Sequence, residues 1–176
     1  MSAADFLLWA EAQEGHWELQ DGAPVAMSPE RVSHVRTKGL AFRALATAIG
    51  RAQLSCEAFS DGVSVRIEDG SVYEPDALVH CGARLAEDAL EASNPVIVVE
   101  VVSPSTAARD HGVKLAGYFS LPSVAHYLIL DPERRVVIHH KRGNGEVLET
   151  RILSAGALRL DPPGLEIPVA ELFAAR

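Results

Sequence analysis

Short apolar stretches separated by polar turns run through most of the chain and predict a strand-rich fold. The stretch 96–99 contains no polar residue, which is typical of a strand buried on both faces. Asp-Gly at 69–70 and Gly-Asn-Gly at 143–145 mark turns between strands. The expected strands lie at 54–58, 63–67, 77–80, 96–102, 126–130, 136–141 and 147–153, and a hairpin joins 17–20 to 24–27.

Apolar residues at helical spacing predict one long helix and three short ones. The long helix is expected to begin at Ser28-Pro29-Glu30 and to run to Ile49, with Gly50 as its stop signal. His34 and Lys38 lie one turn apart at the start of its apolar face, so that end should border a polar network or a site. The apolar face consists of Val35, Ala41, Phe42, Leu45 and Ile49, and the short helices are expected at 3–13, 105–119 and 167–173.

The order of these elements indicates the fold class. The 96–102 strand, the 105–119 helix and the 126–130 strand follow one another, which is typical of a right-handed parallel crossover. We therefore expect a mixed α/β fold, with a central mixed sheet flanked by helices. A length of 176 residues suits one domain that spans 1–176.

Charge is unevenly distributed along the chain. With 16 basic and 24 acidic residues, the net charge of -8 is poorly suited to tight nonspecific binding of nucleic acid. The segment 31–51 differs, because it contains basic residues and no acid. It predicts either a local nucleic-acid-binding face or an ordinary solvated helix face. Its basic residues are Arg31, Arg36, Lys38, Arg43 and Arg51.

Compartment signals are few. No apolar stretch is long enough to span a bilayer and no secretory signal is visible, so we expect a cytoplasmic protein without a membrane anchor. Cys56 and Cys81 lack any Cys-x-x-Cys partner. They are most simply free buried thiols, although a disulfide between them stays open.

Candidate chemistry centres on two acids. Asp76 opens the 77–80 strand, and Glu100 follows the apolar run 96–99. A carboxylate at the end of such a strand is costly unless a charge or a hydrogen-bond donor meets it. Carboxylates on neighbouring strands would repel each other, and a hard divalent cation is one way to stabilise both.

The helix after Glu100 could bring a third charge to the same point. Asp110 and Lys114 are four residues apart and share a helix face, which alone is a common surface pair worth little. Here, however, the expected helix starts directly after the Glu100 strand and returns across its end. Lys114 can therefore reach the two acids.

These residues belong to a wider pattern, which resembles the Uma2 family of bacterial proteins in the PD-(D/E)XK restriction-endonuclease-like superfamily. The resemblance runs from Phe6 to Phe173. It departs from the superfamily at Val102, where a lysine is usual, and this role would move to Lys114. The matching segments are Trp17-Glu18-Leu19-Gln20-Asp21-Gly22, Met27-Ser28-Pro29, His34, Pro75-Asp76, the 100–106 block Glu-Val-Val-Ser-Pro-Ser-Thr, Asp110, Lys114, Tyr118 and the 127–132 segment.

The resemblance implies a restriction-endonuclease-like fold and a metal-dependent site for DNA hydrolysis. Asp76, Glu100 and the Val101 carbonyl would bind Mg²⁺ or Mn²⁺, since all of these ligands are oxygens. Lys114 would act in catalysis together with the two acids. Glu18 would assist catalysis as an accessory metal ligand or by orienting a water; alternatively, it would be a solvent-facing hairpin residue. Contacts to the substrate are expected from His34, Arg36, Lys38 and Asp110, with a structural role as the alternative for His34.

Three function classes follow. The first is a divalent-metal-dependent endonuclease that acts on DNA, with a homodimer as the expected assembly. The second is a catalytically silent module that keeps the nuclease fold for binding or regulation. The third is a metal phosphohydrolase of small nucleotides, which the acidic charge favours. A serine hydrolase is set aside, because the sequence has no Gly-x-Ser-x-Gly motif.

Overall fold

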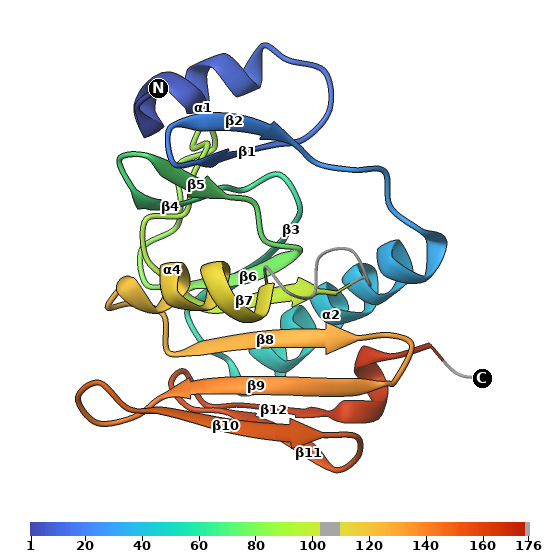
Figure 1. Cartoon of the computed structure of the whole chain (residues 1–176). Helices are drawn as coiled ribbons and strands as arrows, with labels where there is room; N and C mark the ends of the chain where they lie inside the picture. The colour runs from blue at the N-terminus through green and yellow to red at the C-terminus, as the bar shows by residue number, and fades with distance from the viewer. Residues whose placement is uncertain (103–109, 175–176) are drawn as a thin grey trace.

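A six-stranded sheet forms the centre of the protein in this computed structural model, which describes residues 1–102 and 110–174 (Figure 1). The strand order is β10-β9-β8-β7-β6-β3, and every neighbouring pair is antiparallel except β7 and β8. The parallel β7–β8 pair confirms the predicted crossover. The bounds are β3 (Cys56–Ser60), β6 (Ala77–Cys81), β7 (Pro95–Val101), β8 (His126–Asp131), β9 (Val136–Arg142) and β10 (Leu148–Leu153).

A second sheet, with the order β2-β1-β5-β4, lies above the first in Figure 1 and carries α1 (Ala3–Glu11). The predicted hairpin is confirmed, because β1 pairs with β2 across Asp21-Gly22. Both turn residues have positive φ, 49° and 78°, a conformation that suits glycine and costs aspartate little. The strands are β1 (Trp17–Gln20), β2 (Ala23–Ala26), β4 (Val65–Glu68) and β5 (Ser71–Tyr73).

Alternate side chains of the central strands bury themselves on opposite faces of the six-stranded sheet. On one face, Val99 and Leu128 belong to a core with α2 (Val32–Ala52) and the β11–β12 ribbon. On the other face, Val98 and Ile129 pack with Tyr118 of α4 (Leu115–Ser120). The ribbon consists of β11 (Ala157–Leu160) and β12 (Leu165–Pro168). A helix therefore covers each face, as the predicted fold class requires.

The long helix differs from its prediction at both ends. It begins at Val32 rather than at residue 28, because Arg31 is still extended. Gly50 lies within α2, which ends where Gln53 turns into the left-handed conformation with φ 52°. One glycine costs a helix about 1 kcal/mol, which packing of the alanine-rich face outweighs. Val35 was assigned wrongly to the apolar face, since it is 54% exposed.

Several short elements were missed or misplaced. Strands β5, β11 and β12 were not predicted, and residues 167–168 of the expected terminal helix belong to β12. A 3-10 helix, η2 (Val169–Leu172), follows it. Of the 105–119 helix, 105–109 lie outside the described residues, and the rest is a π-helix, η1 (Asp110–Lys114), that continues into α4.

The prediction of free thiols is wrong. Cys56 and Cys81 are opposite one another in the antiparallel β3–β6 pair and form a disulfide. Sequence spacing does not reveal strand register, so it could not choose between the two states. No helix in the described ranges is long and apolar enough to cross a bilayer.

Candidate active site

Asp76 and Glu100 lie on neighbouring strands at the same level of the central sheet. The antiparallel register pairs Ala77 with Val99, which brings the residue before β6 next to Glu100 of β7. Both carboxylates are buried, with exposures of 3% and 5%. Asp76 Oδ2 accepts a 2.5 Å hydrogen bond from the Val101 N–H. The sheet therefore holds both acids in the core rather than in a solvated loop.

Lys114 links Glu100 to the second sheet. Its ammonium lies 2.7 Å from Glu100 Oε1 and 2.9 Å from Glu18 Oε1. Tyr118, one turn further along, donates its hydroxyl to the same Glu100 oxygen at 2.7 Å. Lys114 is only 4% exposed, so the surface-pair interpretation of this lysine is wrong. The helix after β7 does return across the end of that strand.

Glu18 is a buried anchor for this lysine. It is 2% exposed, which rules out the solvent-facing alternative. Besides Lys114, its Oε1 accepts the backbone N–H of Glu74 at 3.2 Å. Two elements from different parts of the chain, β1 and β7, thus place carboxylates around the ammonium that η1 provides.

Lys38 forms a second charged group with three acids. Its Nζ lies 2.7 Å from Glu30, 2.6 Å from Asp61 and 3.1 Å from Asp76 Oδ1. The lysine is 6% exposed, so in this structure its ammonium binds carboxylates rather than facing solvent. These contacts raise its pKa, against the opposing effect of burial.

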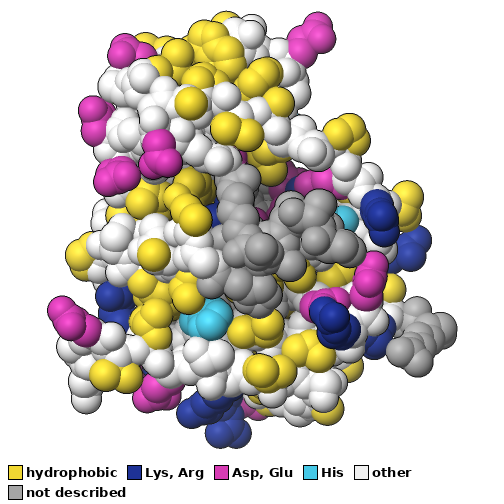
Figure 2. Space-filling model, viewed as in Figure 1, with side chains coloured by type: hydrophobic (Ala, Val, Ile, Leu, Met, Phe, Trp, Pro, Cys, Tyr) yellow, Lys and Arg dark blue, Asp and Glu magenta, His cyan; other side chains and the backbone are white. Residues whose placement is uncertain are grey.

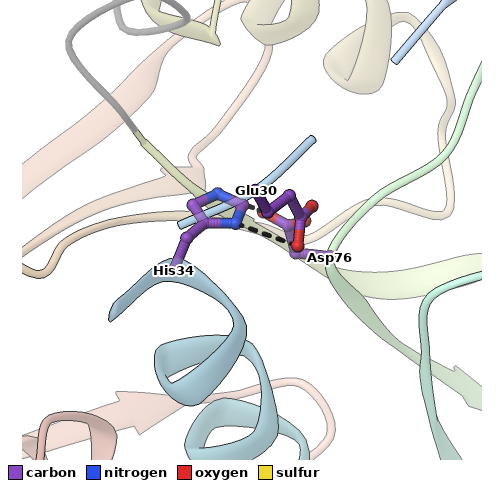
Figure 3. A group of neighbouring side chains, drawn as sticks. All are labelled: Glu30, His34 and Asp76. Atoms are coloured by element: carbon purple, nitrogen blue, oxygen red, sulfur yellow. Dashed lines mark ion pairs between the residues drawn. The ribbon is translucent and has the colours of Figure 1, made fainter. Parts of the chain in front are cut away.

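His34 closes the group around Asp76, and its ring and the carboxylates of Glu30 and Asp76 point toward one another (Figure 3). His34 Nε2 donates a hydrogen bond to the Val101 carbonyl, so Nε2 carries the proton. In the neutral ring, the other nitrogen then has the lone pair. That nitrogen, Nδ1, is buried and has no hydrogen-bond partner among the described residues. It lies 3.4 Å from Glu30 Oε2.

The carboxylates outnumber the ammonium groups at this site. Burial raises the pKa of Asp76, even though Lys38, His34 and the Val101 N–H favour its charged form. Burial also raises the pKa of Glu30, but Lys38 and His34 outweigh this and leave it lowered. The ligand atoms of Glu30, His34 and Asp76 lie within 4.8 Å of one another. An oxygen-rich, desolvated group with an orphaned imidazole nitrogen fits a divalent cation.

The other expected substrate contacts are distributed differently. Arg36 is exposed on α2, as are Arg43 and Arg51. The right-hand side of Figure 2, where Figure 1 has the start of α2, carries basic groups and a histidine at the surface. Asp110 opens η1, but its side chain lies outside the part of the chain that the structure describes.

Sequence reasoning missed two acids of the site, Glu30 and Asp61. Both lie outside helices and strands, and both contact Lys38; Glu30 also lies next to His34. A buried lysine requires acidic partners, so the position of Lys38 on the inner side of α2 was the available signal. It does not say which acids supply the partners.

Comparisons with known proteins identify the family of this chain. The sequence matches the Uma2 family, described as "Putative restriction endonuclease", over residues 3–170, and the chain therefore belongs to that family. Two uncharacterized proteins of Synechocystis sp. are similar to it. One is 28% identical, and the match covers 98% of this chain and 91% of that protein. The other is 26% identical, and the match covers 89% of this chain and 90% of that protein.

A solved structure supports the fold. The crystal structure of a putative nuclease belonging to DUF820 from Anabaena variabilis matches with a TM-score of 0.75 and 16% sequence identity. The match covers 98% of this chain and 97% of the other. At this identity the likeness shows the fold alone, a nuclease-like mixed α+β fold.

Proposed function

We propose that this protein is a divalent-metal-dependent endonuclease that hydrolyses DNA phosphodiester bonds. The observation that carries the proposal is the buried pair Asp76 and Glu100, which adjoining strands hold side by side with Lys114 against Glu100. Membership of the Uma2 family supports it. A site with this many buried acids is costly to fold, and a cation offsets that cost.

Asp76 is the central ligand in this proposal, because it belongs to the group with Glu30 and His34 and adjoins the strand that carries Glu100. Glu100 and the Val101 carbonyl complete the oxygen set expected from the sequence. Glu30 and His34 offer two further donor atoms on the α2 side, and a nitrogen ligand would favour Mn²⁺ over Mg²⁺. When bound, the ion supplies Lewis acidity and neutralises charge that develops on the phosphate.

The residues of the chain have separate tasks. The Lys114 ammonium stabilises negative charge on the phosphate oxygens, in a buried position where such charge stabilisation is strong. Glu18 and Glu100 hold that ammonium in place, and Tyr118 fixes the orientation of Glu100. The exposed Arg36 and Arg43 on α2 bind the DNA backbone outside the site.

Plasmid cleavage with Mn²⁺ tests this proposal. Wild type should cut, whereas Lys114→Ala and Glu100→Gln should lose activity by a factor of about a hundred or more. The chain has three lysines, and Lys141 on β9 provides the matched control. Lys141→Ala should cut like wild type. Equal cleavage by wild type and Lys114→Ala would contradict the role of Lys114.

The acidic net charge supports a second candidate, hydrolysis of small nucleotides. The same variants assayed on nucleoside phosphates and on plasmid separate the two activities. Turnover of neither substrate by a folded, metal-binding wild type would favour the silent binding module. Retained nuclease folds do not guarantee turnover.

A further inference from the structure

The edge strand β10 has an unusual surface for an open sheet edge. It is the last strand of the six-stranded sheet, and only β9 pairs with it among the described strands. Five of its six residues are exposed. Natural edge strands are usually protected by charged side chains, proline or a bulge, and β10 has the exposed Glu149 and Arg151 but no lysine, proline or bulge.

Exposed apolar residues lie on this strand and next to it. Ile152 is 72% exposed, Leu148 is 37% exposed, and Val147, just before the strand, is 59% exposed. In Figure 2, hydrophobic side chains reach the surface in the lower part of the molecule, where Figure 1 has β9 and β10. Single exposed apolar residues are ordinary on protein surfaces, so it is the arrangement of these residues along the strand that matters.

The segment 147–153 is self-complementary about its middle residue, Thr150. When two copies run antiparallel with Thr150 opposite Thr150, each Glu149 lies opposite Arg151 of the other copy. Leu148 then lies opposite Ile152, and both positions are on one face of the sheet because their numbers differ by an even step. The twofold symmetry makes the Glu149–Arg151 and Leu148–Ile152 pairs each occur twice, whereas the Thr150 pair lies on the axis and occurs once.

The charges on β10 are free to form such pairs. The Glu149 and Arg151 side chains are 55% and 68% exposed, and their contact within one strand is long, at 3.8 Å. Within one copy, Lys141 of β9 lies opposite Glu149. In the dimer, Arg151 of the other copy would lie on the opposite side of the same Glu149 carboxylate. Opposite charges and apolar pairs directly across a strand pair are both favourable.

We propose that β10 is a self-association surface, through which two copies of this chain join their sheets into one continuous antiparallel sheet. Main-chain hydrogen bonds along the open edge provide affinity, and the Glu149–Arg151 pairs set the register. The same two charges oppose pairing with a strand of different charge order, because like charges then face each other. The inference is independent of the catalytic site.

Charge reversal tests the register directly. Wild type should be a dimer in sedimentation velocity and light scattering, and dissociate on dilution over a roughly hundredfold range. Arg151→Glu places Glu149 opposite a glutamate, and Glu149→Arg places an arginine opposite Arg151. Each single variant should weaken the dimer at least about tenfold, since two attractive pairs become repulsive.

A mixture of the two single variants provides the decisive comparison. The chain with two acids complements the chain with two arginines, so the mixture should form a heterodimer more tightly than either variant forms a homodimer alone. The double variant Glu149→Arg with Arg151→Glu should recover the homodimer. Arg43→Glu on α2 makes the same charge change elsewhere and should leave the dimer intact.

Three results would overturn the proposal: a monomeric wild type, an Arg151→Glu variant as dimeric as wild type, or a mixture that stays monomeric. Circular dichroism and melting of each variant show that it is folded. The mixture keeps the test valid even if one variant is slightly destabilised, because dimer recovery requires the predicted pairing.

Discussion

Lys114 Nζ lies 2.7 Å from Glu100 Oε1 and 2.9 Å from Glu18 Oε1, and all three side chains are almost completely buried. One ammonium therefore serves two carboxylates that come from different sheets. A buried charge network of this kind is destabilised strongly when one member is removed, because the remaining charges lose their compensation. The relationship makes Lys114 structural as well as catalytic in our proposal.

Replacing Lys114 should therefore lower stability, and metal should restore part of the loss. We expect Lys114→Ala to reduce the free energy of unfolding by about 3 to 5 kcal/mol. Millimolar Mn²⁺ should then stabilise the variant more than wild type, because the unpaired acids attract the cation. Urea unfolding with and without Mn²⁺ measures both effects. A variant as stable as wild type would contradict the buried network, and Lys141→Ala is the control.

Metal binding should itself raise the stability of wild type. At a concentration of about a hundred times the dissociation constant, the gain is about 2.7 kcal/mol. Asp76→Asn should abolish the gain, whereas Asp88→Asn, an exposed site, should keep it. Two ligand sets include Asp76: one with Glu100 and Val101, the other with Glu30 and His34. Loss of the metal-induced gain in Glu100→Gln would favour the first set, and loss of it in Glu30→Gln would favour the second. An unchanged melting temperature in wild type with either Mg²⁺ or Mn²⁺ would contradict the metal site.

DNA binding should depend on the exposed arginines of α2. Arg36→Ala and Arg43→Ala should each weaken binding and reduce the slope of log affinity against log salt by about 1. The exposed Arg84, which contacts Glu57 outside α2, provides the control. Fluorescence anisotropy with labelled duplex DNA measures the slope. Binding that ignores both salt and these substitutions would favour a small nucleotide or a protein partner.

The main-chain framework of the site could be predicted from the sequence. Glu100 ends an apolar run, and a helix that follows such a strand must return across it, so Lys114 was placed near the acids. The partners of Lys38 could not be predicted. Asp61 follows β3 in a turn, and its distance to Lys38 depends on how α2 packs against the sheet.

The strand register and the short strands also could not be predicted from the sequence. The Cys56–Cys81 disulfide depends on a strand pairing 25 residues apart in sequence, which composition does not reveal. Strands β11 and β12 have only four residues each, too few for a clear alternation of apolar and polar positions. Their buried leucines belong to the core that the ribbon shares with α2 and the six-stranded sheet.

A buried histidine pair should make the fold sensitive to acid. His126 Nδ1 and His139 Nε2 share a 2.8 Å hydrogen bond, while His126 Nε2 bonds the Pro162 carbonyl. Burial lowers the pKa of each to about 4, and for His139 neighbouring positive charge contributes to this value. Because the folded pKa is below the usual value of about 6.5, the folded state favours the neutral rings. Stability is complete above about pH 6.5 and falls as pH drops toward 4, by about 3 kcal/mol for one histidine.

Substitution of His139 isolates this effect from that of the carboxylates, which the substitution leaves in place. Urea unfolding of wild type at pH 7, 6 and 5 should show a steady loss of stability, and His139→Phe should show a smaller slope over the same range. The more exposed His16, which pairs with Glu74 far from this pair in the sequence, is replaced by phenylalanine for comparison and should not reproduce the effect of His139→Phe. Parallel pH profiles for wild type and His139→Phe would mean that the pair stays neutral in both states. The measurement would then contradict the assignment of this pair as an acid-sensitive element.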